Sequence, residues 1–448
     1  MQILDTLSNL SLHKKVLWLA IPMVLSNITV PLLGLVDAAV IGHLEHAWYL
    51  GGVALGTTMI SVTFWLLGFL RMATTGLAAQ AYGGKSGHGL ALVLTQGLAM
   101  AWLFALLFLI VHASVADVVF QFSEASEQVK FYGEQYFSIR VWSAPAALAN
   151  FVLLGWLLGT QNAKAPMWMV VITNATNIAL DLLFVIGLEW QVEGAAWASV
   201  LADYTGMSFG SFCVWRTWHQ QNLPPIGDVL RATTRGLSRF IRLNRDIFLR
   251  SLCLQAVFTF MTFQGANYGD EIVAANAVLM SFLMMISYAM DGFAYAMEAM
   301  VGKAIGAKDR HQLTQSLLGT FFWSLIICSA LTLAFAQLGS PLIAMITDIE
   351  PVQQQALHFL PWLVAMPLVS MWCFLLDGIF VGATKGREMR NSMFVATCGF
   401  FVLFWLFEAL QNHALWLSML CFMAARGMAL GWILYRQWRA GAFFPESI

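Results

Sequence analysis

Isolated acids and amides in apolar surroundings are the side chains of this sequence that could carry chemistry. Asp37 lies in a long apolar stretch between residues 22 and 42, and Asn174, Asn177 and Asp181 are spaced at i, i+3 and i+7. That spacing places two amides and an acid on one face of a helix. Because burial favours the neutral form of a carboxyl group, such an acid can take up and release a proton. These residues are therefore candidates for binding a proton or a small cation.

Two prolines lie in the first apolar stretch. Pro22 and Pro31 each remove a backbone donor and crowd the preceding turn, so a helix here should bend easily. A charged acid at the centre of a bilayer costs about 3 kcal/mol or more, and protonation removes most of that cost. A bendable helix that carries Asp37 could therefore couple proton movement to a change of shape.

The composition shows what kind of elements hold these residues. Of 448 residues, 59% are hydrophobic and 10% are charged, whereas about a quarter of a soluble domain is charged. Because a span needs about 20 apolar residues, we expect an all-α polytopic membrane protein with twelve transmembrane helices. The predicted spans are residues 15–41, 51–80, 89–116, 130–159, 166–188, 194–217, 246–267, 272–303, 312–338, 353–382, 389–411 and 414–436.

The basic residues predict the orientation of the chain. Lysine and arginine concentrate in alternate connections, above all in the arginine-rich stretch 218–245, and the remaining connections hold mostly acids. Cytoplasmic loops carry the excess of basic residues. We therefore expect both termini in the cytoplasm.

The two halves of the chain repeat each other. AYGGKSGHGL at 81–90 matches AIGAKDRHQL at 304–313, and we call the offset between these two stretches the repeat offset. Six spans per half is an even number, so the halves enter the membrane from the same side and are related by a pseudo-twofold axis along its normal. This plan is typical of transporters. The expected units are an N-terminal six-helix lobe, a cytoplasmic linker and a C-terminal six-helix lobe: residues 1–217, 218–245 and 246–448.

At the repeat offset, one pair of glycines in each half shares a four-residue spacing. Such glycines permit close contact between helices, and packing is their expected role. They are Gly155, Gly159, Gly378 and Gly382.

The topology places several polar side chains of the first half at a similar depth. Asp37 and Asp181 lie past the midpoints of spans that run outward, and Ser199 lies near the start of a span that runs inward. Neighbouring carboxylates hold one another's protons, because two like charges resist ionising together. We predict a proton- or cation-coupling site formed by Asp37, Asp181, Asn177, Asn174 and Ser199. The alternative for the asparagines is hydrogen bonding between helices.

Four further polar residues of the first half are candidates for binding substrate or forming a network. Arg140 could be the fixed partner of an acid, and Tyr136 and Asn150 lie on the same predicted span. Asp203 lies on the sixth span near Ser199.

The second half holds three candidate acids within its spans. Glu298 and Asp377 lie toward the cytoplasmic ends of their spans and could form a network that holds the lobe shut there, with Asp291 as a third member. The seventh span has no acid between Arg250 and Asp270. The second lobe is therefore expected to be the poorer cation site.

Motifs of soluble enzymes and of metal sites are missing from the sequence. It holds no HExxH, no Walker A motif and no glycine-rich phosphate loop after a strand. GMSFG at 206–210 spells GxSxG, but a nucleophile elbow needs a strand-to-helix turn, and this copy lies within a predicted span. We expect no enzyme, no metal, no cofactor and no nucleic-acid partner, so an ion gradient must drive any transport.

Several stretches resemble the multidrug and toxic compound extrusion (MATE) family. Pro22, Asn27, Asp37 and Gly42 resemble its first-helix pattern. The likeness covers essentially the whole chain and suggests one particular exporter of the DinF branch. It implies two six-helix lobes around a V-shaped cleft, and antiport of organic cations or other drugs against protons or sodium. The stretches that resemble the DinF branch are GWLLGTQNAKAPM at 155–167, NATNIALDLLFVIGL at 174–188, GAAWAS at 194–199 and LDGIFVGATKGREMRNSM at 376–393.

The resemblance also implies where coupling occurs. In the DinF branch the N-terminal lobe carries the coupling site, which here falls on Asp37, Asn177, Asp181 and Ser199. The family usually has threonine at the last position, and serine keeps the hydroxyl. The sodium-driven NorM branch is known for acids in the C-terminal lobe, including one on the seventh helix, and that acid is missing here.

We therefore expect a monomeric, proton-coupled multidrug antiporter that exports amphipathic drugs through the lipid bilayer by alternating access. Sodium is an alternative coupling ion, because carboxylate, amide and hydroxyl oxygens bind hard cations. A flippase for lipid-linked precursors is a second alternative, although its pyrophosphate would need more basic residues than Arg71 and Arg140 in the first lobe. An intramembrane enzyme is the third, with Ser208 of the GxSxG stretch as its only candidate nucleophile.

Overall fold

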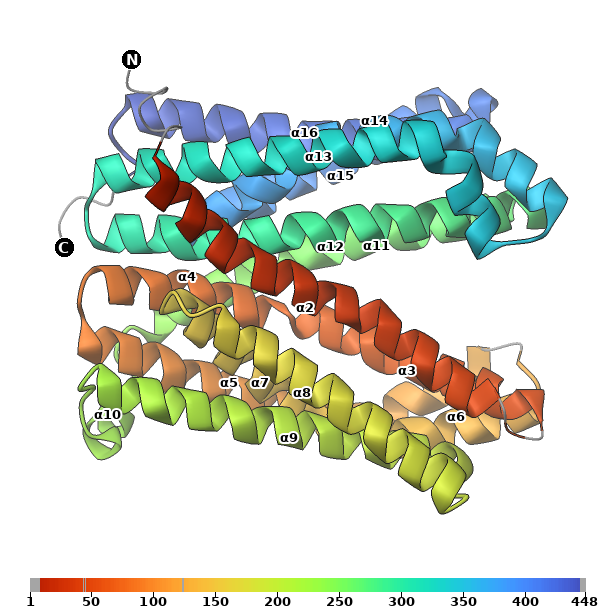
Figure 1. Ribbon diagram of the computed structural model, residues 1–448, viewed down its shortest axis with the longest axis horizontal. Coiled ribbons are helices and arrows are strands. Elements are labelled where there is room, and N and C mark those ends of the chain that lie inside the picture. Colours follow the sequence, from red (N-terminus) through yellow and green to blue (C-terminus); the bar gives the residue numbers. More distant parts are fainter. Residues whose placement is uncertain (1–8, 43, 45, 123–124, 444–448) are drawn as a thin grey trace. The chain divides into compact units, whose positions relative to one another are not determined.

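The computed structural model describes residues 9–42, 44, 46–122 and 125–443, and at Leu35, Asp37, Ala38 and Phe122 it describes the backbone alone. Throughout these residues the regular secondary structure is helical, which confirms the all-α prediction (Figure 1). The helices of the first half are α2 (Leu10–Gly42), α3 (Ala47–Leu67), α4 (Phe69–Gly83), α5 (Gly87–Phe122), α6 (Glu127–Arg140), η1 (Val141–Ser143), α7 (Ala144–Gly159), α8 (Lys164–Asp181), η2 (Leu182–Gly187), α9 (Gln191–Gln220) and α10 (Ile226–Arg231). Those of the second half are α11 (Leu237–Ala266), α12 (Asp270–Gly306), α13 (Arg310–Ile346), α14 (Glu350–Gly382), α15 (Gly386–Leu406), η3 (Glu408–Leu410) and α16 (Asn412–Arg439).

Within the described residues, eleven helical stretches are long and apolar enough to cross a membrane, against twelve predicted spans. Helix α9 occupies the predicted sixth span and has 30 residues, but it is not among the eleven. Its sequence includes Glu193, Asp203 and Arg216 as well as two glutamines, and these residues lower its hydropathy. Length and position therefore mark α9 as a span, whereas hydropathy alone does not.

The chain divides into two compact units. The N-terminal unit is Leu25–Ile241, and the C-terminal unit is Met1–Val24 together with Arg242–Ile448. The division at residue 24 falls within α2, so this helix contributes residues to both units. The linker predicted at 218–245 is held to the N-terminal unit by Gln96, whose amide donates hydrogen bonds to the carbonyls of Thr233 (2.8 Å) and Arg235 (2.7 Å).

The repeat is visible in the closest helix contacts of each unit. A Cβ atom on Gly155 would lie 2.5 Å from the carbonyl oxygen of Arg71, and one on Gly378 would lie 2.7 Å from that of Ala294. The two glycines and the two partners are both related by the repeat offset. The close packing predicted for these glycines is therefore confirmed, between α4 and α7 and between α12 and α14.

Two irregular segments interrupt the helices of the N-terminal unit. The 3-10 turn η1 separates α6 from α7. Pro145, the second residue of α7, lacks the N–H that would bond back to residue 141. The π-helical segment η2 begins directly after Asp181. Arg140 and Asp181 are therefore the last residues of α6 and α8, at points where the helix geometry changes.

Candidate functional site

The polar face predicted on the fifth span lies on α8 inside the N-terminal unit. Asn177 and Asp181 are each 2% exposed, and Asn174 is half-buried. Asn177 donates a hydrogen bond from Nδ2 to the hydroxyl oxygen of Ser199 on α9 over 3.0 Å. The structure thus brings together three of the predicted site residues, with Asn177 and Ser199 in direct contact across two helices.

Helix α2 joins this polar region through a residue that the sequence analysis did not select. Asn174 donates from Nδ2 to the hydroxyl of Thr29 over 2.8 Å, and that hydroxyl donates to the carbonyl of Ser26 over 2.7 Å. A Ser or Thr hydroxyl that bonds back to a carbonyl of its own helix is common. The contact from α8 gives Thr29 a second role, because it fixes α2 against the face that carries Asn177.

The side chain of Asp37 lies outside the described residues, and its backbone belongs to α2. Pro22 and Pro31 lie in the same helix, which runs without interruption from Leu10 to Gly42. The missing N–H groups of both prolines are a property of the sequence. Bending of α2 at these positions therefore stays a prediction.

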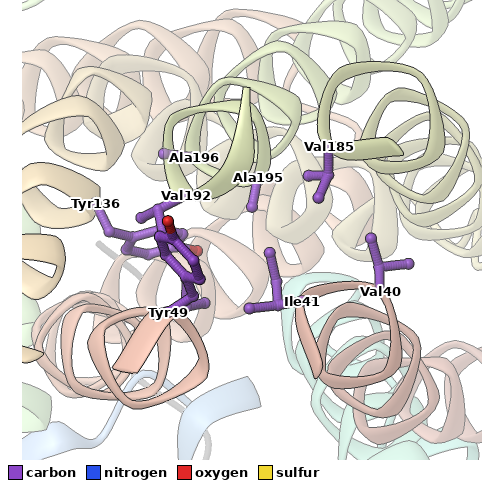
Figure 2. Close-up of a cluster of buried hydrophobic side chains, with 9 residues drawn as sticks. Val40, Ile41, Tyr49, Tyr136, Val185, Val192, Ala195 and Ala196 are labelled. Carbon is purple, nitrogen blue, oxygen red and sulfur yellow. The ribbon is translucent and has the colours of Figure 1, made fainter. Parts of the chain in front are cut away.

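A cluster of buried apolar side chains, which we call the apolar cap, lies next to the polar face (Figure 2). Val185 follows Asp181 by four residues, Ala195 precedes Ser199 by four, and Ile41 follows Asp37 by four, which is about one helical turn each. Figure 2 shows Val40 and Ile41 on α2 pointing toward Val185 and Ala195. The cap therefore covers the polar face at the end where α8 stops. Its members are Val40, Ile41, Tyr49, Val53, Tyr136, Val185, Val192, Ala195 and Ala196.

Arg140 and Asp203 form an ion pair within the N-terminal unit. Nη1 of Arg140 lies 2.7 Å from Oδ2 of Asp203, and each side chain is 16% exposed. Arg140 also donates to the hydroxyl of Ser143, and Asn150 donates from Nδ2 to the backbone carbonyl of Asp203 over 3.0 Å. Arg140 is the fixed partner of an acid, as its position suggested, and the acid is Asp203. Tyr136, one turn before Arg140, is 4% exposed within the cap.

The second unit contains a different buried cluster. Asp377 on α14 accepts hydrogen bonds at Oδ2 from Arg250 on α11 and from Arg426 on α16, the latter over 2.6 Å. The three residues are 6%, 7% and 2% exposed. Neither hydrogen bond involves Glu298, which is 2% exposed on α12. Asp377 therefore lies between two guanidinium groups. A network that also includes Glu298 and Asp291 stays a prediction.

Thr29 and Arg250 are the functional-site neighbours that sequence reasoning missed. A hydroxyl between Pro22 and Pro31 was available as a signal for Thr29. Arg250 lies near the cytoplasmic end of its predicted span, where a snorkelling side chain is the ordinary expectation. Only the packing of α11 against the rest of its unit reveals that Arg250 turns inward.

The repeat relates the polar face to an aromatic cluster in the other unit. At the repeat offset, Asn177 and Asp181 correspond to Phe400 and Phe404, and Asp37 corresponds to Phe260. The ring of Phe260 packs edge-on against Phe400 (6.0 Å between centroids) and Phe404 (5.1 Å). Three positions that are polar in the first half are therefore aromatic in the second, where Phe260 contacts the other two.

A search of the described residues finds no group of three or more histidine, cysteine or acidic side chains that could hold a metal ion. The polar atoms of the site are amide, hydroxyl and carboxyl groups. This set can bind a proton or a hard cation and offers no nucleophile aligned with a base.

Comparison with known proteins places the chain among membrane transporters. A family model described as MatE matches residues 22–183 and 247–409, once in each half, as the repeat predicts. The chain is 46% identical over 435 residues to the DNA damage-inducible protein F of Escherichia coli (strain K12), which covers 97% of this chain and 94% of that relative. This relative bears out the likeness to the DinF branch.

Solved structures share the fold at low sequence identity. A MOP superfamily transporter from Pyrococcus furiosus matches with a TM-score of 0.84 and 20% identity, over 96% of both chains. A mutant of the Vibrio cholerae MATE transporter VcmN matches with a TM-score of 0.82 and 20% identity, over 97% of this chain and 99% of that one. The particular exporter suggested by the resemblance was VcmN. Because the chain is 20% identical to VcmN, the suggestion is wrong, and the chain is a different protein that shares its fold.

Proposed function

This chain belongs to the MatE family of multidrug efflux transporters, and we propose that it is a proton-coupled antiporter that exports organic cations and other amphipathic drugs. We also propose that the protein is a monomer in a bacterial inner membrane. The distribution of its basic residues supports cytoplasmic positions for both termini. The observation that carries the proposal is the buried face of Asn177 and Asp181 against Ser199 in the N-terminal unit.

The ion pairs support the assignment of the proton to Asp37 and Asp181. Asp203 is paired with Arg140, and Asp377 lies between two arginines. Each of these carboxylates already has a guanidinium group as its hydrogen-bond partner, so we assign the proton to neither of them. Of the acids predicted for the N-terminal lobe, Asp37 and Asp181 remain as the proposed carriers.

The repeat supports placing Asp37 beside Asn177 and Asp181. At the repeat offset, the counterpart of Asp37 is Phe260, and its ring contacts both Phe400 and Phe404, the counterparts of Asn177 and Asp181. A duplicated fold keeps equivalent positions together. We therefore propose that Asp37 completes the site on α8 from its place on α2.

The energy of one proton is sufficient for export. A proton contributes about 1.4 kcal/mol per pH unit and about 2.3 kcal/mol per 100 mV. Together these supply about 3.7 kcal/mol, and each 1.4 kcal/mol is a tenfold gradient. One proton can therefore support roughly a few-hundred-fold gradient of an uncharged drug, and a second proton widens that margin.

The proposed coupling step uses the two prolines and the apolar cap. When Asp37 and Asp181 are protonated, the polar face no longer requires a hydrated path, and α2 can bend at Pro22 or Pro31. Residues Val40 and Ile41 belong to the cap, so bending of α2 moves part of the cap with it. We propose that this movement of α2 releases the drug.

Proteoliposomes test the coupling ion and its site. The protein is reconstituted with a fluorescent cationic drug, and uptake is measured with a pH gradient alone and with a sodium gradient alone. We expect the pH gradient to drive uptake in the wild type and to fail in Asp37→Asn and Asp181→Asn. Asp117→Asn, an exposed acid on α5, is the matched control and should keep wild-type uptake.

If a sodium gradient alone drives uptake, the coupling ion at the proposed site is sodium rather than the proton. Full pH-driven uptake in Asp37→Asn would contradict the site itself. Drug binding, measured by fluorescence polarisation in detergent, separates both outcomes from a variant that has merely misfolded.

A further inference from the structure

Two histidine rings face each other in the C-terminal unit, at the end where α14 and α16 begin. His413 is the second residue of α16, and its Nε2 lies 3.1 Å from Nε2 of His358 on α14. Trp362, one turn further along α14, donates its indole N–H to Nδ1 of His413 over 3.0 Å. Phe359 packs against both imidazole rings, at 5.0 Å and 4.8 Å between centroids. A chain of hydrogen bonds, Trp362 to His413 to His358, therefore joins the two helices.

The chemistry of the donors determines the tautomers. An indole nitrogen can only donate, so Nδ1 of His413 must present a lone pair. A neutral His413 then carries its proton on Nε2 and donates it to His358. His358 accepts at Nε2, and its own proton is on Nδ1. Both rings are neutral in this arrangement.

A further proton is incompatible with the chain. On Nδ1 of His413 it would point at the indole N–H, and on Nε2 of His358 it would point at the Nε2–H of His413. If His413 changes tautomer to accept from His358, it loses its bond to Trp362 instead. Protonation of either ring therefore breaks one of the two hydrogen bonds between α14 and α16.

Among the described residues, no charged side chain forms a hydrogen bond or an ion pair with either histidine. The hydrogen bonds and ring contacts of His358 and His413 are with each other, Phe359 and Trp362. The acids at the same end of the unit form no hydrogen bond or ion pair with either ring. They are Asp270 and Glu271 on α12, Asp348 after α13, Glu350 on α14 and Glu408 on η3.

We propose that His358 and His413 form a second proton-binding site, in the C-terminal unit, that joins α14 to α16 when neutral and releases them when protonated. His358 is exposed and His413 lies at the start of its helix, so water can deliver the proton. Pro361 lies between His358 and Trp362 and leaves one helical hydrogen bond of α14 unmade, so this part of α14 can move when the chain opens. The orientation predicted from the basic residues puts this end on the periplasmic side, the side from which protons enter. Histidine is suited to this role because its unperturbed titration falls near neutral pH.

Imidazole ¹⁵N NMR of the histidine-labelled protein in nanodiscs tests the site without any transport. The signal of His413 is assigned by its absence in His413→Gln, and at pH 8 we expect it to show an unprotonated Nδ1 and a protonated Nε2. In Trp362→Phe, the midpoint of its titration should move to higher pH by about 0.7 unit, the equivalent of one hydrogen bond. Trp405→Phe, a 68% exposed tryptophan on α15, is the matched control and should leave the midpoint unchanged.

The inference is overturned if His413 is protonated on Nδ1 at pH 8, or if Trp362→Phe titrates like the wild type. Its effect on transport rests on the proposed function and has its own measurement. In proteoliposomes, His358→Gln should remove the dependence of drug uptake on external pH between about 5 and 7, whereas His219→Gln should not. The amide introduced by His358→Gln can still accept from His413 but cannot be protonated, so loss of all uptake would contradict a regulatory role. An NMR result as expected together with failed pH-driven uptake would contradict the antiport proposal alone.

Discussion

Neutralising Asp203 alone should destabilise the N-terminal unit more than neutralising Asp203 and Arg140 together. Asp203→Asn keeps the shape of the side chain and the backbone carbonyl that Asn150 contacts, and it removes the charge that faces Arg140 at 2.7 Å. Arg140 would keep its contacts with neutral groups, such as the hydroxyl of Ser143 and the ring of Phe64, whose centroid lies 5.8 Å from Cζ. An unpaired charge in a buried site is the costly product of this change, rather than the loss of the contact itself.

The magnitude follows from the burial of the pair. Breaking a buried ion pair by removing one partner costs about 3–5 kcal/mol. Each side chain here is 16% exposed, so water can screen part of the charge, and we take the lower value of about 3 kcal/mol. Since a unit of this size loses about 2–4 °C per kcal/mol, the apparent melting temperature should fall by about 6–12 °C. The double variant Arg140→Gln, Asp203→Asn buries no charge and should lose less than half of that.

Thermal unfolding in detergent, followed by tryptophan fluorescence, measures Asp203→Asn, Arg140→Gln and the double variant. If Asp203→Asn melts within about 2 °C of the wild type, the pair is screened and the reasoning on burial is wrong. If the double variant loses the sum of the two single losses, the two residues are not coupled. The folded fraction of Asp203→Asn should also keep pH-driven uptake, and a specific loss of proton coupling there would move the proton carrier from Asp181 to Asp203.

Three further changes test other parts of the structure. Gly155→Ala should lower the melting temperature, because its Cβ would lie 2.5 Å from a carbonyl oxygen of the facing helix, whereas Gly399→Ala meets nothing within 4 Å and should be neutral or stabilising. Asp377→Asn should reduce the yield of folded protein on size exclusion more than the single neutralisation above, because it leaves two guanidinium groups without their acid; an equal yield would show that the cluster is hydrated. Gln96→Ala should speed trypsin cleavage within 231–242 several-fold, because the amide of Gln96 holds two carbonyls of that segment, and an unchanged rate would show that other contacts hold it.

The sequence was sufficient for the helices because spans are set by length and composition. The repeat was equally readable, since close helix contact restricts positions such as Gly155 and Gly378 to glycine. Hydropathy failed only at α9, where Asp203 and other polar groups face the interior of the unit. The sequence also could not show that the stretch up to Val24 groups with the second half of the chain, because this grouping depends on tertiary contacts.

The site was predictable as far as residue type and helical spacing determine it. The i, i+3, i+7 spacing placed Asn177 and Asp181 together, and the topology placed Ser199 at their depth. The partners of the arginines were not predictable in the same way. Whether Arg250 reaches lipid headgroups or Asp377 depends on the rotation of α11 about its axis, and a rotation of one residue, about 100°, changes the answer.

The divergence of the two halves bears on how many ions the protein can couple. Phe400 and Phe404 fill the positions equivalent to Asn177 and Asp181, and their rings pack against Phe260. A carboxyl group introduced there would lack the amide and hydroxyl partners that Asn177 and Ser199 provide in the N-terminal unit. Asp377 of the C-terminal unit lies elsewhere, between two arginines. Duplication therefore supplied two frameworks, but the polar face of amides and an acid lies on α8 of the N-terminal unit, where the other unit has phenylalanines. We therefore propose that the proton that drives the cycle acts through α2 and α8.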